Sequence, residues 1–282
     1  MAIKRSETSN IVFHNRKSSD FGMKLLFPFN PPSPAPDQTP IQVPGASGDL
    51  PVRSHSVRAV EAAINAVIRI PHRYTGWGEL RSDIEHWLYG QEDWLKFDRE
   101  PEYLYKAVLT QAPTFTPVSP QRINATLNFH FQPYKYRAKT IHWRKLDDSM
   151  VMYQKPVDEI DTSGTPAVQG TFINDETENV YPDWHLRGTG NFMLHVNGFP
   201  YEFDNLNGDI YLLGDRGNAY SADPRDNPSE IQLLNGNVQL ANNWSPQLLC
   251  RGKGENTIAL YPLDTDSKLE VAEFIPKLRR LV

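Results

Sequence analysis

The sequence predicts a mainly β protein of two domains: an N-terminal β-sandwich-like domain with one short α-helix and a β-hairpin, then a C-terminal antiparallel β-sandwich. The chain has 282 residues, and single hydrophobic cores stop growing at roughly 250 to 300 residues. Asn-Gly, a strong hairpin signal, occurs at 197–198, 207–208 and 235–236. No helical period is visible between residues 165 and 262, which favours strands throughout the second half.

A helix is predicted at the start of residues 76–110. Its apolar residues fall at i, i+4, i+7 and i+8, which places them on one face. Gly78 is expected to precede the helix, and Gly90 is expected to close it in a left-handed cap conformation. The residues of the predicted buried face are Leu80, Ile84, Trp87 and Leu88.

A hairpin is predicted directly after this helix. Residues 94–97 and 103–109 are rich in aromatic and branched side chains, and the acidic, proline-containing segment 98–101 is the expected turn. We expect the helix and the hairpin to meet in a buried contact made by Trp87, Leu88, Trp94 and Phe97.

The segments before the helix differ in how clearly they can be assigned. Residues 11–30 predict two strands around a polar turn at 18–20. Residues 30–44 contain six prolines, which predicts an extended loop or arm, because proline fixes φ and lacks an N–H. Residues 55–70 are ambiguous, since their alanines favour a helix and their end at 67–70 favours a strand.

The middle and the second half of the chain read as strands. Residues 121–133 alternate apolar and polar side chains over one long strand, which Pro133 is expected to end. Around the Asn-Gly turns lie the short apolar segments 192–196, 210–213 and 231–234, which favour an antiparallel sandwich.

Composition and charge exclude several classes of function. No apolar run approaches the ~18 residues of a membrane span, and the first ten residues lack the apolar core of a signal peptide. Residues 1–140 carry 17 Lys+Arg and 13 Asp+Glu, and the rest carry 12 and 21, so neither half is a basic nucleic-acid binder. The single Cys250 excludes an internal disulfide and is expected to be a small buried hydrophobe.

Catalytic, metal and cofactor motifs are missing from the sequence. Asp20-Phe21-Gly22 lacks a kinase context, and the glycine pairs at 188–190 and 252–254 lack a third glycine. The eight histidines form no close ligand pair, and the calcium-like segment 264–268 has a lysine at its fifth position. We expect no cofactor, no metal and no enzymatic activity. A glycosidase pair of carboxylates stays open, because such a pair comes together only on folding.

Sugar binding is the rival interpretation of the second half. His195-Val196-Asn197 is similar to the start of the galectin H-x-N-P-R motif, but Gly198-Phe199 replace its proline and arginine. Aromatic side chains could stack on sugar rings or fill a sandwich core instead. The candidate saccharide contacts are Trp184, His195, Asn197 and Trp244.

Three motifs resemble the siphophage distal tail proteins (the Dit family). A helix that ends in Trp87-Leu88 leads into a W-L-x-F-D strand at 94–98, an acidic-Pro turn and a Y-L-Y-K-A strand at 103–107. Residues 15–23 resemble the opening segment of the family, and residues 43–50 resemble its V-P-G-x-x-G-x-L loop. The pieces at 205–213, 219–220, 246–248 and 252–258 are similar to the galectin-like C-terminal domain of Dit proteins.

The resemblance implies a structural protein of a phage tail tip. It implies a homo-hexameric ring at the distal end of a long non-contractile tail, connecting the tail tube protein to tail-tip, baseplate or receptor-binding proteins. Residues 1–138 would form the ring, residues 139–282 would be a galectin-like docking domain, and a strand is expected at 55–70. The chain would be made in the host cytoplasm and end in the virion. The implied assembly interface is the N-terminal helix and hairpin, with Leu80, Ile84, Trp87, Leu88, Trp94, Phe97, Tyr103 and Tyr105.

The alternative is a carbohydrate-binding, lectin-like module, free or part of a cell-wall glycosidase. A cell-wall saccharide would then be its partner. Molecular mass separates the two interpretations, because a ring of one chain needs head-to-tail interfaces that close on themselves, whereas a lectin module should stay small.

Overall fold

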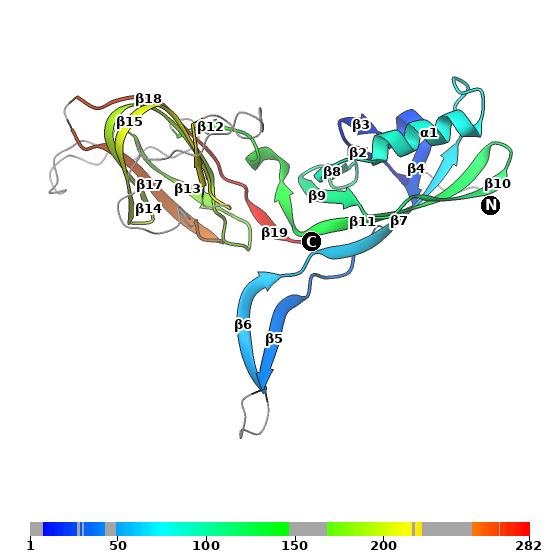
Figure 1. The fold of residues 1–282 in the computed structure, drawn as a ribbon, viewed down its shortest axis with the longest axis horizontal. Coiled ribbons are helices and arrows are strands. Elements are labelled where there is room, and N and C mark those ends of the chain that lie inside the picture. The colour runs from blue at the N-terminus through cyan, green and yellow to red at the C-terminus, as the bar shows by residue number, and fades with distance from the viewer. Residues whose placement is uncertain are drawn as a thin grey trace. The chain divides into compact units, whose positions relative to one another are not determined.

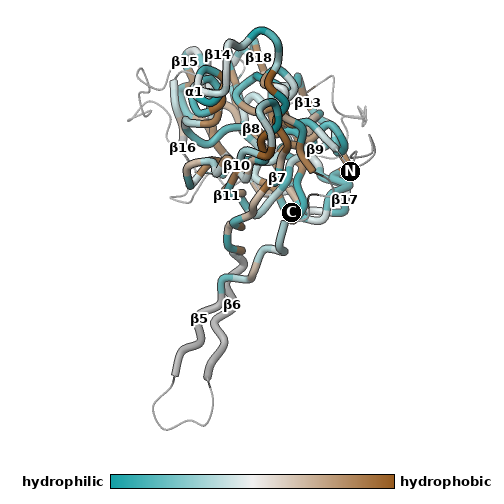
Figure 2. Tube along the Cα trace, turned by 90° about the vertical axis from the view of Figure 1, so that its right-hand side faces the viewer, coloured by the Kyte–Doolittle hydropathy of each residue, from teal (hydrophilic) through white to brown (hydrophobic). Residues whose placement is uncertain are grey.

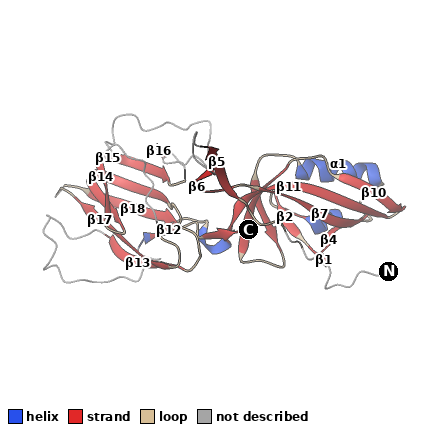
Figure 3. Ribbon diagram, turned by 90° about the horizontal axis from the view of Figure 1, so that it is seen from below, coloured by secondary structure: helices blue, strands red, loops and turns tan. Residues whose placement is uncertain are grey.

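The computed structural model describes residues 8–26, 29, 31–42, 49–146, 168–215, 218–221, 250–264 and 266–282. The chain divides into two compact units: unit 1 is Met1–Ala138 with Arg280–Val282, and unit 2 is Lys139–Arg279. Strands dominate the described residues, which contain one α-helix (Figures 1 and 3). The predicted mainly β fold class is confirmed.

Unit 1 is built on a ten-stranded sheet. The strands are β1 (Thr8–Ser9), β2 (Ile11–Phe13), β3 (Arg16–Lys17), β4 (Met23–Leu26), β7 (Val60–Arg69), β8 (Asp93–Phe97), β9 (Tyr103–Leu109), β10 (Thr114–Ser119), β11 (Arg122–Arg137) and β19 (Arg279–Leu281). Their order is β1-β4-β7-β11-β9-β8-β2-β3, and β10 and β19 also pair with β11. The predicted hairpin is confirmed as β8 and β9, and the polar turn as the 3₁₀ helix η2 (Ser18–Phe21).

The strand β7 settles the ambiguity of residues 55–70. It pairs with β11 from Val60 to Arg69, and its buried residues Ile64, Ala66 and Ile68 alternate with more exposed ones. The helix propensity of its alanines is outweighed because each side chain fits a pleated, half-buried surface. Figure 2 shows hydrophobic residues along β7, β8 and β11.

The long strand β11 continues past Pro133, so the prediction that this proline ends it was wrong. The pairing of β11 with β9 shifts register between Phe131 and Lys135. A proline is tolerated in such an irregularity because no ladder bond needs its missing N–H. The Pro133 carbonyl accepts a hydrogen bond from the Val282 N–H at 3.0 Å.

The helix α1 (Trp77–Leu88) buries the predicted face, but neither glycine has the predicted role. Gly78 lies inside the helix, and Gly76 is its N-cap residue. The C-cap is Tyr89, whose backbone is extended, so Gly90 forms no left-handed cap. Gly90 instead allows a close approach, since a Cβ there would lie 2.8 Å from His14 Cε1.

Substituting alanine at these two glycines is expected to give effects of opposite sign. Gly90→Ala should lower the free energy of unfolding by about 1 to 3 kcal/mol through overpacking, because hydrogen-bond contacts to the carbonyls of Trp87 (2.9 Å) and Gln91 (3.2 Å) hold the His14 ring in place. Gly78→Ala meets no atom within 4 Å and should raise stability by about 0.5 to 1 kcal/mol. Urea unfolding would measure both. A Gly90→Ala protein as stable as the parent would contradict the proposed crowding.

Unit 2 is a curled antiparallel sheet. Its strands are β12 (Arg144–Lys145), β13 (Val168–Asn174), β14 (Asp183–Val196), β15 (Phe199–Leu213), β16 (Asn218–Tyr220), β17 (Gly254–Pro262) and β18 (Lys268–Ile275). The order is β12-β18-β14-β15-β16, with β17 joining β14 to β13. The strand β14 pairs with β18 along its first half and with β17 along its second. β18 and β17 therefore follow one another along the edge of β14 that lies opposite β15.

The three Asn-Gly pairs have different outcomes. Asn197 and Gly198 form the two-residue turn between β14 and β15, with φ of 53° and 82°, as predicted. The pair at 207–208 lies inside β15, opposite Thr189 and Gly188 of β14, so the predicted hairpin there was wrong. Gly208 has a positive φ, 96°, within this paired stretch. The pair at 235–236 and the segment 231–234 lie outside the described residues.

Candidate functional site

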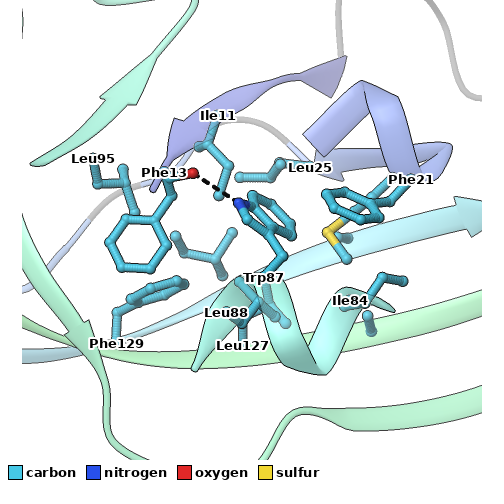
Figure 4. Close-up of a cluster of buried hydrophobic side chains, with 14 of the residues drawn as sticks. Ile11, Phe13, Phe21, Leu25, Ile84, Trp87, Leu88, Leu95, Leu127 and Phe129 are labelled. Carbon is cyan, nitrogen blue, oxygen red and sulfur yellow. Dashed lines mark hydrogen bonds between the residues drawn. The ribbon is translucent and has the colours of Figure 1, made fainter. Parts of the chain in front are cut away.

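The predicted assembly residues on α1 lie in the core of unit 1. Leu80, Ile84, Trp87 and Leu88 are at most 2% exposed. The Trp87 Nε1–H donates to the Phe13 carbonyl at 2.7 Å, and its ring stacks on Phe21 at 4.7 Å between centroids (Figure 4). These side chains hold the helix on the sheet, so they leave little surface for a second subunit to contact.

The hairpin residues are buried too, with one exception. Phe97, Tyr103 and Tyr105 are at most 7% exposed. Trp94 lies on the other face of β8, half-buried, with its ring 5.3 Å from Tyr136 and 5.2 Å from the Lys106 Nζ. The expectation that Trp94 joins the buried contact between helix and hairpin was wrong, because strand side chains alternate and Leu95 and Phe97 take the inner positions.

The outer face of α1 is exposed to solvent and is therefore accessible to a neighbouring molecule. Arg81 Nε lies 2.8 Å from Glu85 Oε1 at i,i+4 spacing, and Tyr89 at the end of the helix is 50% exposed. Such an exposed pair stabilises the helix by only ~0.3 to 0.5 kcal/mol. It therefore does little for the fold, and its charges are accessible from solvent.

The proline-rich segment forms an arm rather than a loop. β5 (Pro36–Gln42) pairs with β6 (Asp49–Val57) in a two-stranded sheet of its own (Figure 1). At its base, Arg58 N–H donates to the Ala35 carbonyl at 2.9 Å, so the chain enters and leaves the arm at adjacent positions. The sequence predicted an extended loop or arm here, and the structure shows an arm whose backbone is paired.

Prolines shape the edges of this arm. Pro40 and Pro51 are cross-strand partners, and neither has an N–H to give to the other strand. Such a pair fits a non-hydrogen-bonded site, where the two nitrogens face outward along the edges. The missing outer donors limit uncontrolled edge-to-edge pairing, while an isolated two-stranded hairpin is marginally stable in water at best. Among the described residues, the two strands of the arm pair with each other in a sheet of their own.

A polar cluster behind β9 was missed by the sequence reasoning. The Tyr105 hydroxyl donates to Glu100, and the Lys135 Nζ lies 2.5 Å from Glu100 Oε1 and 4.8 Å from the centre of the Tyr103 ring. Burial, together with the bond to Glu100, raises the pKa of Tyr105, so the phenol keeps its proton and remains a donor. Arg280 lies 5.1 Å from the centre of the Tyr103 ring. No local sequence pattern predicts these contacts, because the residues that make them are brought together only by strand pairing.

The predicted saccharide contacts do not assemble into a site. Trp184 is fully buried and stacks on Phe274 at 5.5 Å, so its assignment to a sugar ring was wrong. Asn197 stabilises its own turn: its Oδ1 accepts from Thr257 N–H at 3.0 Å, and its Nδ2 donates to Asn256 at 2.9 Å. Burial lowers the pKa of His195. Trp244 lies outside the described residues.

Metal and nucleophile chemistry find little support in the described residues. Within them, no group of three or more His, Cys, Asp or Glu side chains could hold a metal ion. Cys250 is fully buried, and burial raises the pKa of its thiol, which disfavours the reactive thiolate. Among the helices of the described residues, none has both the length and the apolar character needed to cross a bilayer.

Comparison with solved structures gives an informative likeness. No family model and no curated protein matches the sequence. Among solved structures, the chain is similar to the Dit protein of phage SPP1, described as a paradigm of the hub adsorption apparatus in phages that infect Gram-positive bacteria. The sequences are 14% identical, the TM-score is 0.57, and the match covers 94% of this chain and 97% of the SPP1 protein. The chain therefore has a Dit-like fold.

Proposed function

We propose that this protein is a structural component of a phage tail tip, a homo-hexameric ring at the distal end of a long non-contractile tail. The observation that carries the proposal is the Dit-like fold, which extends over 94% of the chain and so includes both units. In the virion, the ring connects the tail tube protein to tail-tip, baseplate or receptor-binding proteins.

The arm supports self-assembly. A hairpin with no third strand gains stability when a partner covers it, and a head-to-tail ring gives every copy such a partner while leaving no arm unpaired. The outer face of α1, with Arg81, Glu85 and Tyr89, is the second surface that we assign to contacts between subunits. The buried face of the helix contributes to these contacts only indirectly, because it holds the outer face in position.

The two parts of the chain take different roles. Residues 1–138 form the ring. Residues 139–282, a galectin-like domain in this proposal, dock other tail proteins by shape rather than by chemistry. We propose no catalytic role for the protein, and of the predicted sugar contacts Trp184 is buried and Asn197 is held in its own turn.

The mass of the purified chain tests the ring directly. Six chains of 32.2 kDa give about 193 kDa, against 32.2 kDa for a monomer. Light scattering should report the larger mass, and negative-stain images should show closed six-fold rings. A chain that stays monomeric at high micromolar concentration, with and without tail tube protein, would contradict the proposal.

A further inference from the structure

Two arginines lie directly opposite each other on the sheet of unit 1. Arg69 of β7 and Arg122 of β11 are cross-strand partners. Their neighbours Ile68 and Ile123 belong to the core that also buries α1, so alternation places both arginines on the side of the sheet that faces away from this helix. The Arg69 N–H donates to the Gly22 carbonyl at 3.0 Å rather than to β11. The two arginines therefore form a non-hydrogen-bonded pair, whose Cα atoms lie only ~4.5 Å apart.

No ion pair compensates these two charges in the part of the chain that the structure describes. Neither guanidinium has a carboxylate partner there, and the buried Nε of Arg122 has no hydrogen-bond partner. Lys24 of β4 adds a third positive charge nearby, because its cross-strand partner Val67 lies two positions before Arg69 on the same side of β7. Like charges directly opposite each other in a sheet are destabilising. An anionic group from another molecule would remove this repulsion.

The outer face of α1 carries the opposite charge. Glu79 and Asp83 are exposed and four positions apart, so their carboxylates are neighbours on one stripe of the helix. The Thr75 N–H and hydroxyl donate to Glu79 Oε2 at 2.9 and 2.8 Å. The Tyr74 hydroxyl donates to Asp83 Oδ2 at 3.0 Å. These neutral donors orient the carboxylates and leave both negative charges in place, and like charges at this spacing destabilise a helix.

Unit 1 thus presents opposite charges on opposite sides of one sheet. Figure 1 shows α1 on one side of β7 and β11, and the arginine pair lies on the other. A contact that joins these two sides of neighbouring copies is head-to-tail, which is the kind of contact that closes into a ring. A guanidinium can donate two parallel hydrogen bonds to one carboxylate, so two arginines match two carboxylates. Complementary charges of this kind also fix the register of a contact and disfavour wrong partners.

We propose that Glu79 and Asp83 of one copy bind Arg69 and Arg122 of the next copy. This contact rests on the ring proposed above, in which the outer face of α1 already takes part, and it adds the surface that this face meets. The occupant of the arginine site is a second copy of this chain, because the complementary pair of carboxylates is present on unit 1 itself.

Exchanging the charges of the two surfaces tests the contact in the full-length protein. The sheet variant is Arg69→Glu/Arg122→Glu, and the helix variant is Glu79→Lys/Asp83→Lys. Either variant alone puts like charges into every contact of the ring, so the protein concentration needed for assembly, followed by light scattering, should rise at least about tenfold. An equimolar mixture of the two should assemble at the concentration of the parent, because a hexamer of alternating variants again pairs opposite charges at every contact.

A matched control separates this contact from a general effect of charge. Arg251→Glu/Lys268→Glu changes the net charge as the sheet variant does, at exposed positions of unit 2, and should assemble like the parent. Asp83→Lys alone keeps the hydrogen bonds between Thr75 and Glu79. It replaces the helix variant if that protein does not fold, and it should still raise the concentration needed for assembly.

Two results would overturn the proposal and leave the ring intact. One is a sheet variant or a helix variant that assembles at the same concentration as the parent. The other is a mixture that does not recover assembly. If the rings persist in the sheet variant and the parent alone binds a DNA duplex in an electrophoretic shift, the arginine pair binds nucleic acid instead. A parent that forms no ring would contradict the proposed function itself, and this contact with it.

Discussion

Replacing Trp87 with alanine is expected to lower the free energy of unfolding of unit 1 by about 3 to 5 kcal/mol. The side chain is 2% exposed, stacks on Phe21 and donates to the Phe13 carbonyl, so its removal leaves a cavity and takes away a buried hydrogen bond. Such a loss is a large part of the ~5 to 15 kcal/mol by which domains are typically stable. Urea unfolding followed by circular dichroism would measure it.

Two further variants show which part of the Trp87 contact matters. Trp87→Phe keeps an aromatic ring but removes the indole N–H that donates to the Phe13 carbonyl, which should cost about 1 to 3 kcal/mol. Arg81→Ala, on the solvent side of the same helix, should change stability by at most about 0.5 kcal/mol. If Trp87→Ala melts within a few degrees of the parent, the helix does not depend on this contact.

Removing the arm is expected to abolish the ring while leaving unit 1 folded. The arm is a separate two-stranded sheet, and its base is closed by the hydrogen bond between Arg58 N–H and the Ala35 carbonyl. Residues 36–57 can therefore be replaced by a short Gly-Ser link without stretching the chain. Light scattering should then report about 32.2 kDa, with a thermal unfolding curve close to that of the parent.

The control for this deletion keeps the arm. Arg58→Ala removes an ion pair with Asp37 whose side chains are 64% and 45% exposed, and exposed pairs contribute little. This variant should form the ring as the parent does. If the chain without the arm still assembles into closed rings, the proposed role of the arm is wrong, whatever the stability of that variant.

Local patterns predicted the elements that depend on local geometry. The spacing of Leu80, Ile84, Trp87 and Leu88 identified the buried face of α1, because a helix fixes which residues share a side. The turn at Asn197-Gly198 followed from the positive φ that both positions need. The alternation of residues 121–133 was visible because a strand has a period of two.

The errors arose where a distant partner decided the outcome. Pro133 is tolerated inside β11 because the pairing with β9 shifts there. Asn207-Gly208 continues β15 because β14 pairs with it on both sides of these residues. Trp184 became a core residue through its contact with Phe274 of β18, ninety positions later in the chain. In each case the residue type is compatible with two environments, and the pairing of distant strands decided which one it occupies.

The sequence by itself thus determined the fold class, the buried face of α1, the strand period and the turn at 197–198, all of which follow from backbone geometry within a few residues. Tertiary structure decided which side chains share a surface. The contact of His185 with Asp209 and Glu273, like that of Tyr105 with Lys135, joins residues that are far apart in the chain. Strand register places them side by side, and register depends on the pairing of the whole sheet rather than on any one segment.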